Sequence, residues 1–266
     1  MTKAQWDARS GLVADAMKVF TRPFVTPRIH EPPHPTECAD HEQGEAPHMR
    51  DAPPVIGTGS YIEREKINII TCEHVARHRP LSHQFFNNPK LVPAPDPCRI
   101  DPDPVDAALI PIDTGTWNSI PHVARPISMS KFAPRHQPVQ DELLFFRGIA
   151  GENIYVGFGG VDSIMSGYCS QEKHSSGNHT IFEILWNPQQ SALTPGTDPE
   201  AKARVKYDNP KGFSGSLVWN TKFVELGCNI NAWQPDDAVI TGLVQRWGTS
   251  TGTLSAWRVE HLLAWL

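Results

Sequence analysis

Proline constrains this chain more than any other residue, because 25 of the 266 residues are proline. Proline fixes one backbone angle and has no N–H to donate, so this frequency disfavours long helices and continuous central strands. We therefore expect short strands joined by irregular loops. Hydrophobic residues make up 39% of the chain. That fraction suffices for the core of one large domain or two small ones and argues against full disorder.

Charge and hydropathy exclude several classes of protein. A formal net charge of −5 argues against a nucleic-acid partner bound through bulk charge. No apolar run approaches the roughly 18 residues of a membrane span, so we expect no membrane partner. The first twenty residues carry charges throughout and contain no apolar core of a signal peptide. The five cysteines are odd in number and widely spaced, which favours reduced thiols and a cytoplasmic location.

The N-terminal residues 1–54 are expected to form an extension. Leu12, Ala16 and Val19 recur at helical spacing, which predicts an amphipathic helix whose apolar face docks on the main domain. A partner-binding or regulatory arm is the alternative, and covering the functional site is one role it could have. Residues 22–54 contain eight prolines and little apolar periodicity, so we expect a loop-like connector.

Short strands are predicted from residue 55 onward. Residues 56–62 and 66–71 read as a hairpin, and residues 107–112 form a short buried run. A second group of strands follows, at 143–146, 154–158, 161–165, 180–186, 216–219 and 239–247. Residues 256–266 predict a helix with one apolar face. Two antiparallel barrels or sandwiches fit this order, with boundaries at 55–125 and 126–266.

Three short motifs carry residues that could perform chemistry. Ser214 lies in Gly-Phe-Ser-Gly, His74 follows the hydrophobic run Ile-Ile-Thr-Cys-Glu, and Asp106 opens the run Ala-Ala-Leu-Ile. Glycines permit the tight turn that presents a serine and its neighbouring N–H groups. Taken singly, each motif is explained as well by a turn or a strand end. Asp101 and Asp103 are rivals of Asp106, but they lie between prolines without a buried strand.

Together, His74, Asp106 and Ser214 resemble the chymotrypsin/trypsin-like serine protease family, in particular a bacterial intracellular branch. Residues 71–75 resemble the family's T-A-A-H strand end, and Asp106-Ala-Ala-Leu-Ile resembles its D-x-A-L strand. Gly212-Phe-Ser-Gly-Ser resembles its G-[ND]-S-G-G loop, and residues 243–248 resemble its substrate-binding strand. Over residues 55–266 the resemblance implies an all-β fold of two antiparallel six-stranded barrels ending in a C-terminal helix.

The resemblance also implies a mechanism, that of a serine endopeptidase acting on polypeptides through an acyl-enzyme. Ser214 would attack the peptide carbonyl, His74 would act as base and then acid, and Asp106 would orient His74. The N–H groups of Gly212 and Ser214 would bind the oxyanion, with no metal or cofactor. Histidines ordinarily become protonated below about pH 6.5, so activity should fall there. A catalytically inactive trypsin-like module that binds proteins is the alternative.

Several residues depart from the family pattern. Phe213 stands where zymogen-type members place an Asp that binds a new N-terminal amine, so we expect no activation by N-terminal insertion. Ser216 replaces the second glycine of the serine loop. Cys72 and Glu73 replace two alanines beside His74, and we expect Glu73 to point to solvent. Val75 replaces a cysteine that is bridged in secreted members, consistent with a reducing compartment.

Substrate choice depends on residues near the expected specificity pocket. Asp208, six residues before Ser214, resembles the carboxylate that pairs with a basic P1 side chain, although Asp-Asn-Pro is also turn chemistry. Trp247 and Gly248 would line the same pocket. Arg246 and Trp247 alternate faces of one strand, so either could face the pocket.

The N-terminal connector also contains candidate metal ligands. His30, His34, Cys38 and His41 lie within twelve residues, followed by His48. Cysteine and histidine are zinc ligands, and four make a tetrahedral set. The spacing matches no zinc-finger pattern, and a polar His-rich loop is the simpler interpretation.

Overall fold

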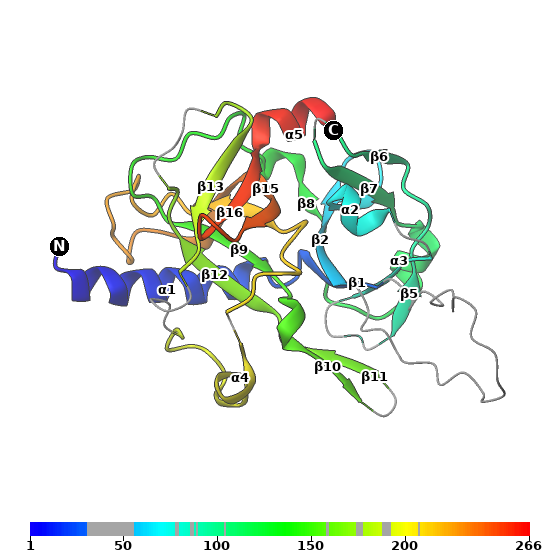
Figure 1. The fold of residues 1–266 in the computed structure, drawn as a ribbon, viewed down its shortest axis with the longest axis horizontal. Coiled ribbons are helices and arrows are strands. Elements are labelled where there is room, and N and C mark those ends of the chain that lie inside the picture. Colours follow the sequence, from blue (N-terminus) through cyan, green and yellow to red (C-terminus); the bar gives the residue numbers. More distant parts are fainter. Residues whose placement is uncertain are drawn as a thin grey trace.

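The computed structural model describes residues 1–30, 56–77, 80–85, 88, 90–103, 105–157, 160–173, 178–187, 193–206 and 208–266. The fold is mostly β, as predicted. Two large sheets lie side by side, with helix α1 (Lys3–Thr21) extending to the left of the molecule and helix α5 (Val259–Trp265) at its top in the view of Figure 1. Among the described residues, no helix is long and apolar enough to cross a membrane.

The first sheet has eight strands. Their order is β5 (Leu91–Pro93), β4 (Ser82–Gln84), β1 (Val25–His30), β2 (Ile56–Glu63), β3 (Ile67–Thr71), β7 (Ala107–Pro111) and β6 (Arg99–Asp101), with β8 (Ile127–Ser128) parallel to β2. Strands β2 and β3 pair as an antiparallel hairpin, which confirms the prediction for residues 56–71.

Strand β1 corrects the expected organisation of the N-terminal segment. Residues 25–30 were expected to be part of a loop-like connector, but they pair with β2 on one side and β4 on the other. The register of β1 on β2 shifts between Thr26 and Ile29, and Pro27 lies in that irregularity. A proline can therefore sit within this strand because the ladder is already interrupted there.

The second sheet has six strands. Their order is β12 (Ser166–Ser170), β9 (Leu144–Gly148), β14 (Leu217–Asn220), β15 (Val239–Gly248), β16 (Thr253–Arg258) and β13 (Ile181–Leu185). The sheet curls so that its edges meet at a bridge between Glu172 and Ile184. The Lys173 N–H donates to the Glu183 carbonyl there, at 2.8 Å. Because the first sheet has eight strands, the structure does not show the expected pair of closed six-stranded barrels.

A separate hairpin and several short helices complete the fold. Strands β10 (Ile154–Gly157) and β11 (Gly160–Ser163) project from the second sheet (Figure 1). The helices between strands are α2 (Glu73–Ala76), α3 (Thr114–Ser119) and α4 (Pro199–Arg204), with 3₁₀ turns η1 (Met129–Lys131), η2 (Gly151–Asn153) and η4 (Pro235–Asp237). Helix α5 begins later than predicted, because residues 253–258 pair with β15 first.

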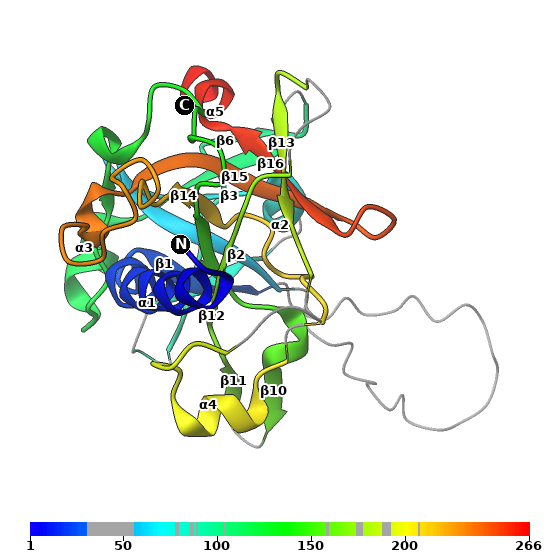
Figure 2. The ribbon, with the colours of Figure 1, turned by 90° about the vertical axis from the view of Figure 1, so that its left-hand side faces the viewer.

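Helix α1 docks on the sheets, but through a different face from the predicted one. Figure 2 views it nearly end-on, against the body of the molecule. Val13 and Met17 are fully buried, whereas Leu12 is 48% exposed and Val19 74% exposed. The side chain of Thr2 caps the first turn by accepting the N–H of Gln5. The apolar positions alone were ambiguous, since stripes through residues 13 and 17 and through residues 12 and 19 both fit helical spacing.

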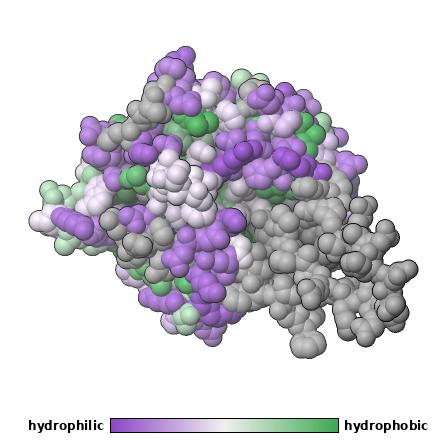
Figure 3. Space-filling view, in the orientation of Figure 1, coloured by the Kyte–Doolittle hydropathy of each residue, from purple (hydrophilic) through white to green (hydrophobic). Residues whose placement is uncertain are grey.

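Apolar side chains fill two core clusters. The first extends from α1 through the first sheet to α5, and the second lies within the second sheet around Phe146, Phe182 and Phe213. Figure 3 shows that the visible face is mostly hydrophilic, with hydrophobic residues in small separate groups. The C-terminal helix links the two sheets, because the indole N–H of Trp265 donates to Asp101 at 2.6 Å.

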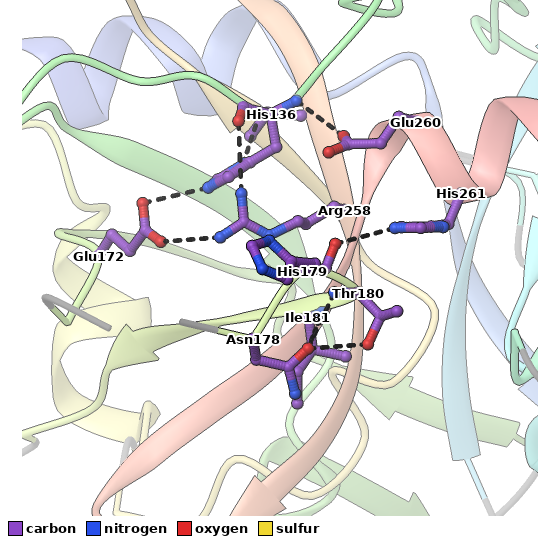
Figure 4. A network of polar contacts seen from close by, with 10 residues as sticks. His136, Glu172, Asn178, His179, Thr180, Ile181, Arg258, Glu260 and His261 are labelled. Carbon is purple, nitrogen blue, oxygen red and sulfur yellow. Dashed lines mark hydrogen bonds and ion pairs between the residues drawn. The ribbon is translucent and has the colours of Figure 1, made fainter. Parts of the chain in front are cut away.

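A polar network anchors the segment between the two sheets (Figure 4). The buried His136 ring bonds Thr241 through Nδ1, at 2.7 Å, and Glu172 through Nε2, at 3.1 Å. The backbone N–H of His136 donates to Glu260 at 2.8 Å, and Arg258 lies 3.9 Å from Glu172. The ring also stacks on Phe182. Every polar atom of the buried imidazole therefore has a partner.

A second buried histidine lies in an aromatic cluster of the first sheet. His83 is 1% exposed, and its Nδ1 lies 3.2 Å from the hydroxyl of Tyr61. Its Nε2 has no partner among the described residues. Burial, and after it the charge of His122, lowers the pKa of His83 to about 4. The folded protein therefore holds this imidazole neutral.

The docked face of α1 gives a matched pair of variants in one helix. Met17→Ala should lower the free energy of unfolding by about 2–5 kcal/mol, because it leaves a cavity in the core. Val19→Ala should change it by less than about 0.5 kcal/mol, because Val19 is exposed. Urea denaturation measures both. A larger loss for Val19→Ala would show that the helix docks through the other face.

The lowered pKa of His83 predicts a pH-dependent stability. Between pH 6.5 and 4 the unfolded chain binds a proton at His83 that the folded protein does not, so stability is complete above pH 6.5 and falls as the pH drops through this window. The shift corresponds to roughly 3 kcal/mol. Denaturation at several pH values should show a shallower acid loss for His83→Gln than for the natural protein. Parallel profiles would contradict the buried neutral imidazole.

Candidate active site

His74 and Asp106 form a hydrogen-bonded pair at one end of the first sheet. Asp106 lies directly before β7 and is 2% exposed, while His74 lies in α2, just beyond the end of β3. The Nδ1 atom of His74 lies 2.7 Å from Oδ2 of Asp106, and the backbone N–H of His74 donates to Oδ1 at 3.1 Å. Both carboxylate oxygens of Asp106 thus hold the same residue.

The hydrogen bond to Asp106 determines which nitrogen of the His74 ring carries the proton. Burial raises the pKa of Asp106, but the hydrogen bonds and charge of His74 outweigh it, so its pKa is lowered below the usual value. An ionised carboxylate can only accept hydrogen bonds. The proton in the short contact therefore belongs to Nδ1 of His74. In the neutral ring, Nε2 is left with a lone pair that can accept a proton.

The local backbone differs from the predicted strand end. Strand β3 stops at Thr71, and the chain turns into the short helix α2. The expectation that Glu73 points to solvent is wrong. Glu73 is 8% exposed, and its carboxylate forms an ion pair with Arg77, one helical turn later, at 2.6 Å. The spacing of four residues on a helix makes this pairing available and keeps the carboxylate bonded to an arginine.

Ser214 lies in a tight loop before β14. Gly212 has φ of +106° and Gly215 has φ of +90°, a left-handed region that side chains rarely enter. A Cβ at Gly212 would lie 2.3 Å from the carbonyl of Ile149, and one at Gly215 would lie 2.0 Å from the carbonyl of Thr58. Both glycines are therefore required by the backbone, and the loop presses directly on β2.

Thr58 of β2 holds this loop from the opposite sheet. Its N–H donates to the carbonyl of Ser214 at 3.0 Å, and its hydroxyl donates to the carbonyl of Gly212 at 2.8 Å. The same hydroxyl accepts the N–H of Ile149 at 3.1 Å, and the Thr58 carbonyl accepts the hydroxyl of Thr71 at 2.7 Å. Thr58 is fully buried. Nothing in the sequence marks Thr58 as a residue of the site, because a threonine in a predicted strand carries no catalytic signal.

Thr58 also sets which groups of the serine loop remain available. The carbonyls of Gly212 and Ser214 are both occupied by Thr58. Among the hydrogen bonds of the described residues, none uses the N–H of Gly212 or the N–H of Ser214. Two donors two residues apart are thus free for a ligand, which is the composition of an oxyanion-binding site.

The structure brings the serine loop to the pair of His74 and Asp106. The carbonyl of Val244 accepts both the N–H of Gly215, at 2.9 Å, and the thiol of Cys72, at 3.2 Å. The carbonyl oxygen of Val244 therefore contacts both Gly215, next to Ser214, and Cys72, two residues before His74. The hydroxyl of half-buried Ser214 donates to the carbonyl of Gln245 at 2.9 Å rather than to His74. No hydrogen bond joins Ser214 to His74 among the described residues, so the hydroxyl has to leave Gln245 before His74 could take its proton.

Cys72 completes a cluster that has the composition of a metal site. Its Sγ and the ligand atoms of His74 and Asp106 all lie within 4.8 Å of one another. Burial, and after it the charge of Asp106, raises the pKa of the Cys72 thiol well above its usual value, whereas a metal requires the thiolate. His74 and Asp106 are also bonded to each other. These residues fit a hydrogen-bonded cluster better than a metal centre.

The expected specificity residues lie in different environments. Asp208 is exposed, and the N–H of the next residue, Asn209, donates to Glu152 at 2.9 Å. Trp247 packs on the second core cluster, while Arg246 is exposed. The carbonyl of Gly248 accepts the N–H of Gly252 at 3.0 Å. The assignment of Asp208, Trp247 and Gly248 to a substrate pocket stays a prediction.

Other candidates from the sequence are resolved in part. Asp101 bonds Trp265 and Arg99, so this rival of Asp106 is committed elsewhere. Ser216 is fully buried, and its hydroxyl has no partner among the described residues. Phe213 is 2% exposed and packs edge-on against Phe146.

Of the proposed zinc ligands, only the backbone of His30 is described. His34, Cys38, His41 and His48 lie outside the described residues.

The bonds made by Thr58 predict a specific pattern in variants. Thr58→Val should lower the free energy of unfolding by about 1–3 kcal/mol, because it leaves the carbonyl of Gly212 and the N–H of Ile149 buried without partners. Thr58→Ser keeps the hydroxyl and should lose less. Chemical denaturation of both variants tests this. Equal stability of the valine and serine variants would show that the hydroxyl contributes nothing.

Comparisons with known proteins give only distant matches. No protein-family model and no curated protein matches the chain. A similar solved structure is the serine protease domain of the Sesbania mosaic virus polyprotein, at 12% identity and TM-score 0.46, over 79% of this chain and 85% of that one. The thermostable serine protease AL20 from an extremophilic microorganism is 9% identical with TM-score 0.47, over 90% of this chain and 92% of that one. The HtrA-type protease AlgW is 11% identical with TM-score 0.48, over 93% of this chain and 64% of that one. At such distances their activity does not transfer to this chain.

Proposed function

We propose that this protein is a serine endopeptidase of the trypsin-like kind, with Ser214 as nucleophile, His74 as base and Asp106 as its orienting carboxylate. The observation that carries the proposal is the buried Asp106, which holds the His74 ring and backbone together, beside a serine loop with two free N–H groups. Nucleophile, oriented base and oxyanion donors are the parts that acyl transfer requires.

The geometry supports a sequence of proton transfers. His74 accepts the hydroxyl proton of Ser214 at Nε2 as the oxygen attacks the peptide carbonyl, and Asp106 stabilises the imidazolium that forms. The N–H groups of Gly212 and Ser214 donate to the oxyanion of the tetrahedral intermediate. His74 then protonates the leaving amine, and an acyl-enzyme on Ser214 is hydrolysed by water. This sequence uses side chains and backbone groups of the chain together with one water molecule.

A second function is favoured by one observation. The hydroxyl of Ser214 is bonded to Gln245 and not to His74, as expected of a trypsin-like module that binds proteins without cleaving them. The same contact is compatible with an enzyme whose serine turns toward the base when substrate binds, because apo geometries of catalytic hydrogen bonds are often loose.

The N-terminal segment is proposed to act as a regulatory region that binds a protein partner. Its deletion is a poor test, because removing residues 1–54 would remove β1 from between β2 and β4. Activation by insertion of a new N-terminus is not part of the proposal, since Phe213 fills the second core and offers no carboxylate.

The proposal includes a basic P1 preference and a cytoplasmic location. A basic P1 preference rests on Asp208, whose exposed carboxylate would have to be covered by the substrate side chain. A cytoplasmic location rests on the thiols, since the four cysteines of the described residues, Cys72, Cys98, Cys169 and Cys228, are all free.

Labelling with a fluorophosphonate probe tests the proposed nucleophile. The natural protein should be labelled at Ser214, Ser214→Ala should not react, and Asp106→Asn should react on the order of 10⁴-fold more slowly, since it disturbs the tautomer of the base. Mass spectrometry of the labelled peptide identifies the serine.

A buried serine gives the matched control. Ser216→Ala changes a hydroxyl two residues away and should leave labelling of Ser214 in place. Absence of labelling in a folded natural protein would contradict the endopeptidase and favour the binding module. Labelling that persists in Ser214→Ala would assign the reactive group to another residue.

A further inference from the structure

A β-bulge places Arg246 beside the candidate nucleophile. Strand β15 pairs with β16 through Val244 and Ala256 and then through Arg246 and Ser255, so Gln245 is the extra residue of the bulge. The carbonyl of Gln245 accepts the hydroxyl of Ser214 at 2.9 Å. Arg246 is therefore the next residue after the backbone group that touches Ser214.

The side chain of Arg246 is directed away from the core. Its neighbour Trp247 packs on the second core cluster, and successive residues of a strand face opposite sides. Arg246 is accordingly exposed. Its charge nevertheless reaches the candidate site. Burial raises the pKa of both Asp106 and Cys72, while the Arg246 guanidinium lowers both.

Among the described residues, no ion pair or side-chain hydrogen bond uses the guanidinium of Arg246. The backbone carbonyl of Arg246 accepts the hydroxyl of Ser255 at 3.1 Å. The nearest acidic groups of the site are occupied, because Asp106 holds His74 and Glu73 is paired with Arg77. Lys211, exposed on the serine loop, adds a second positive charge. Arg246 and Lys211 thus place two exposed positive charges next to Ser214 and its loop, in addition to the exposed carboxylate of Asp208 earlier in the same segment.

We propose that Arg246 binds a carboxylate side chain of the substrate, so that the protein selects polypeptides with Asp or Glu within a few residues of the scissile bond. The proposal rests on the proposed endopeptidase function. The planar guanidinium offers paired N–H donors that match a carboxylate. An exposed pair of this kind supplies specificity more than affinity, because water screens it.

Pairs of peptides test this selection. A combinatorial peptide library read by mass spectrometry gives a cleaved sequence, which is resynthesised with Glu or Gln at each flanking position. The natural protein should cleave one Glu peptide about tenfold faster in kcat/KM than its Gln partner. Arg246→Gln should lose this difference, so that its kcat/KM values for the Glu peptide and the Gln peptide become equal. Arg64→Gln, an exposed arginine in the turn between β2 and β3, should retain it.

A charge-reversal variant of Arg246 and a peptide-binding assay distinguish failure of the specificity proposal from failure of the endopeptidase proposal. Arg246→Glu should prefer Lys over Glu at the same position. Ser214→Ala, incubated with the library, should retain acidic peptides, and the double variant with Arg246→Gln should not. Equal cleavage of Glu and Gln peptides by the natural protein, or a Glu preference that survives Arg246→Gln, would overturn the proposal. Acidic-peptide binding without any cleavage would instead refute the endopeptidase and leave Arg246 as a binding residue.

Discussion

The structure of the site depends on Thr58, a buried threonine that belongs to one sheet and holds the loop of the other. Its backbone N–H and its hydroxyl occupy the carbonyls of Ser214 and Gly212. Each carbonyl is coplanar with the N–H of the next residue, so these bonds orient the peptide unit after Gly212 and the one after Ser214, and the N–H of Ser214 lies between these two held units. The left-handed glycines at 212 and 215 allow this close approach. Donors that are fixed before the substrate arrives need little reorganisation during the reaction.

The electrostatics of the site follow from one buried carboxylate. Asp106 is enclosed, yet three influences keep it ionised: the ring of His74, the backbone N–H of His74 and the more distant charge of Arg246. The other buried acid nearby, Glu73, is paired with Arg77. Each buried charge therefore has a partner, as burial requires. The positive charge of Arg246 is left for solvent or substrate.

The sequence predicted the parts of the fold that depend on local pattern. The β2–β3 hairpin, the N-terminal helix and the order of the later strands were accessible, because apolar alternation and turn residues mark them. Strand β1 was missed because the prolines of residues 22–54 suggested a loop, and the irregular pairing with β2 accommodates Pro27. The docked face of α1 and the ion pair of Glu73 depend on which neighbours the chain meets in space. The pairing of His74 with Asp106 could be anticipated, whereas the bonds of Thr58 to Gly212 and Ser214 join residues more than 150 positions apart.

A crystal structure of the protein after reaction with a phosphonate inhibitor tests the central claim most directly. We expect phosphorus on Oγ of Ser214, with the phosphonyl oxygen within about 3 Å of the N–H groups of Gly212 and Ser214, as an oxyanion site requires. The carbonyls of these residues should remain bonded to Thr58, and His74 should still contact Asp106. A phosphonyl oxygen that points away from both N–H groups, or an adduct on another residue, would contradict this claim.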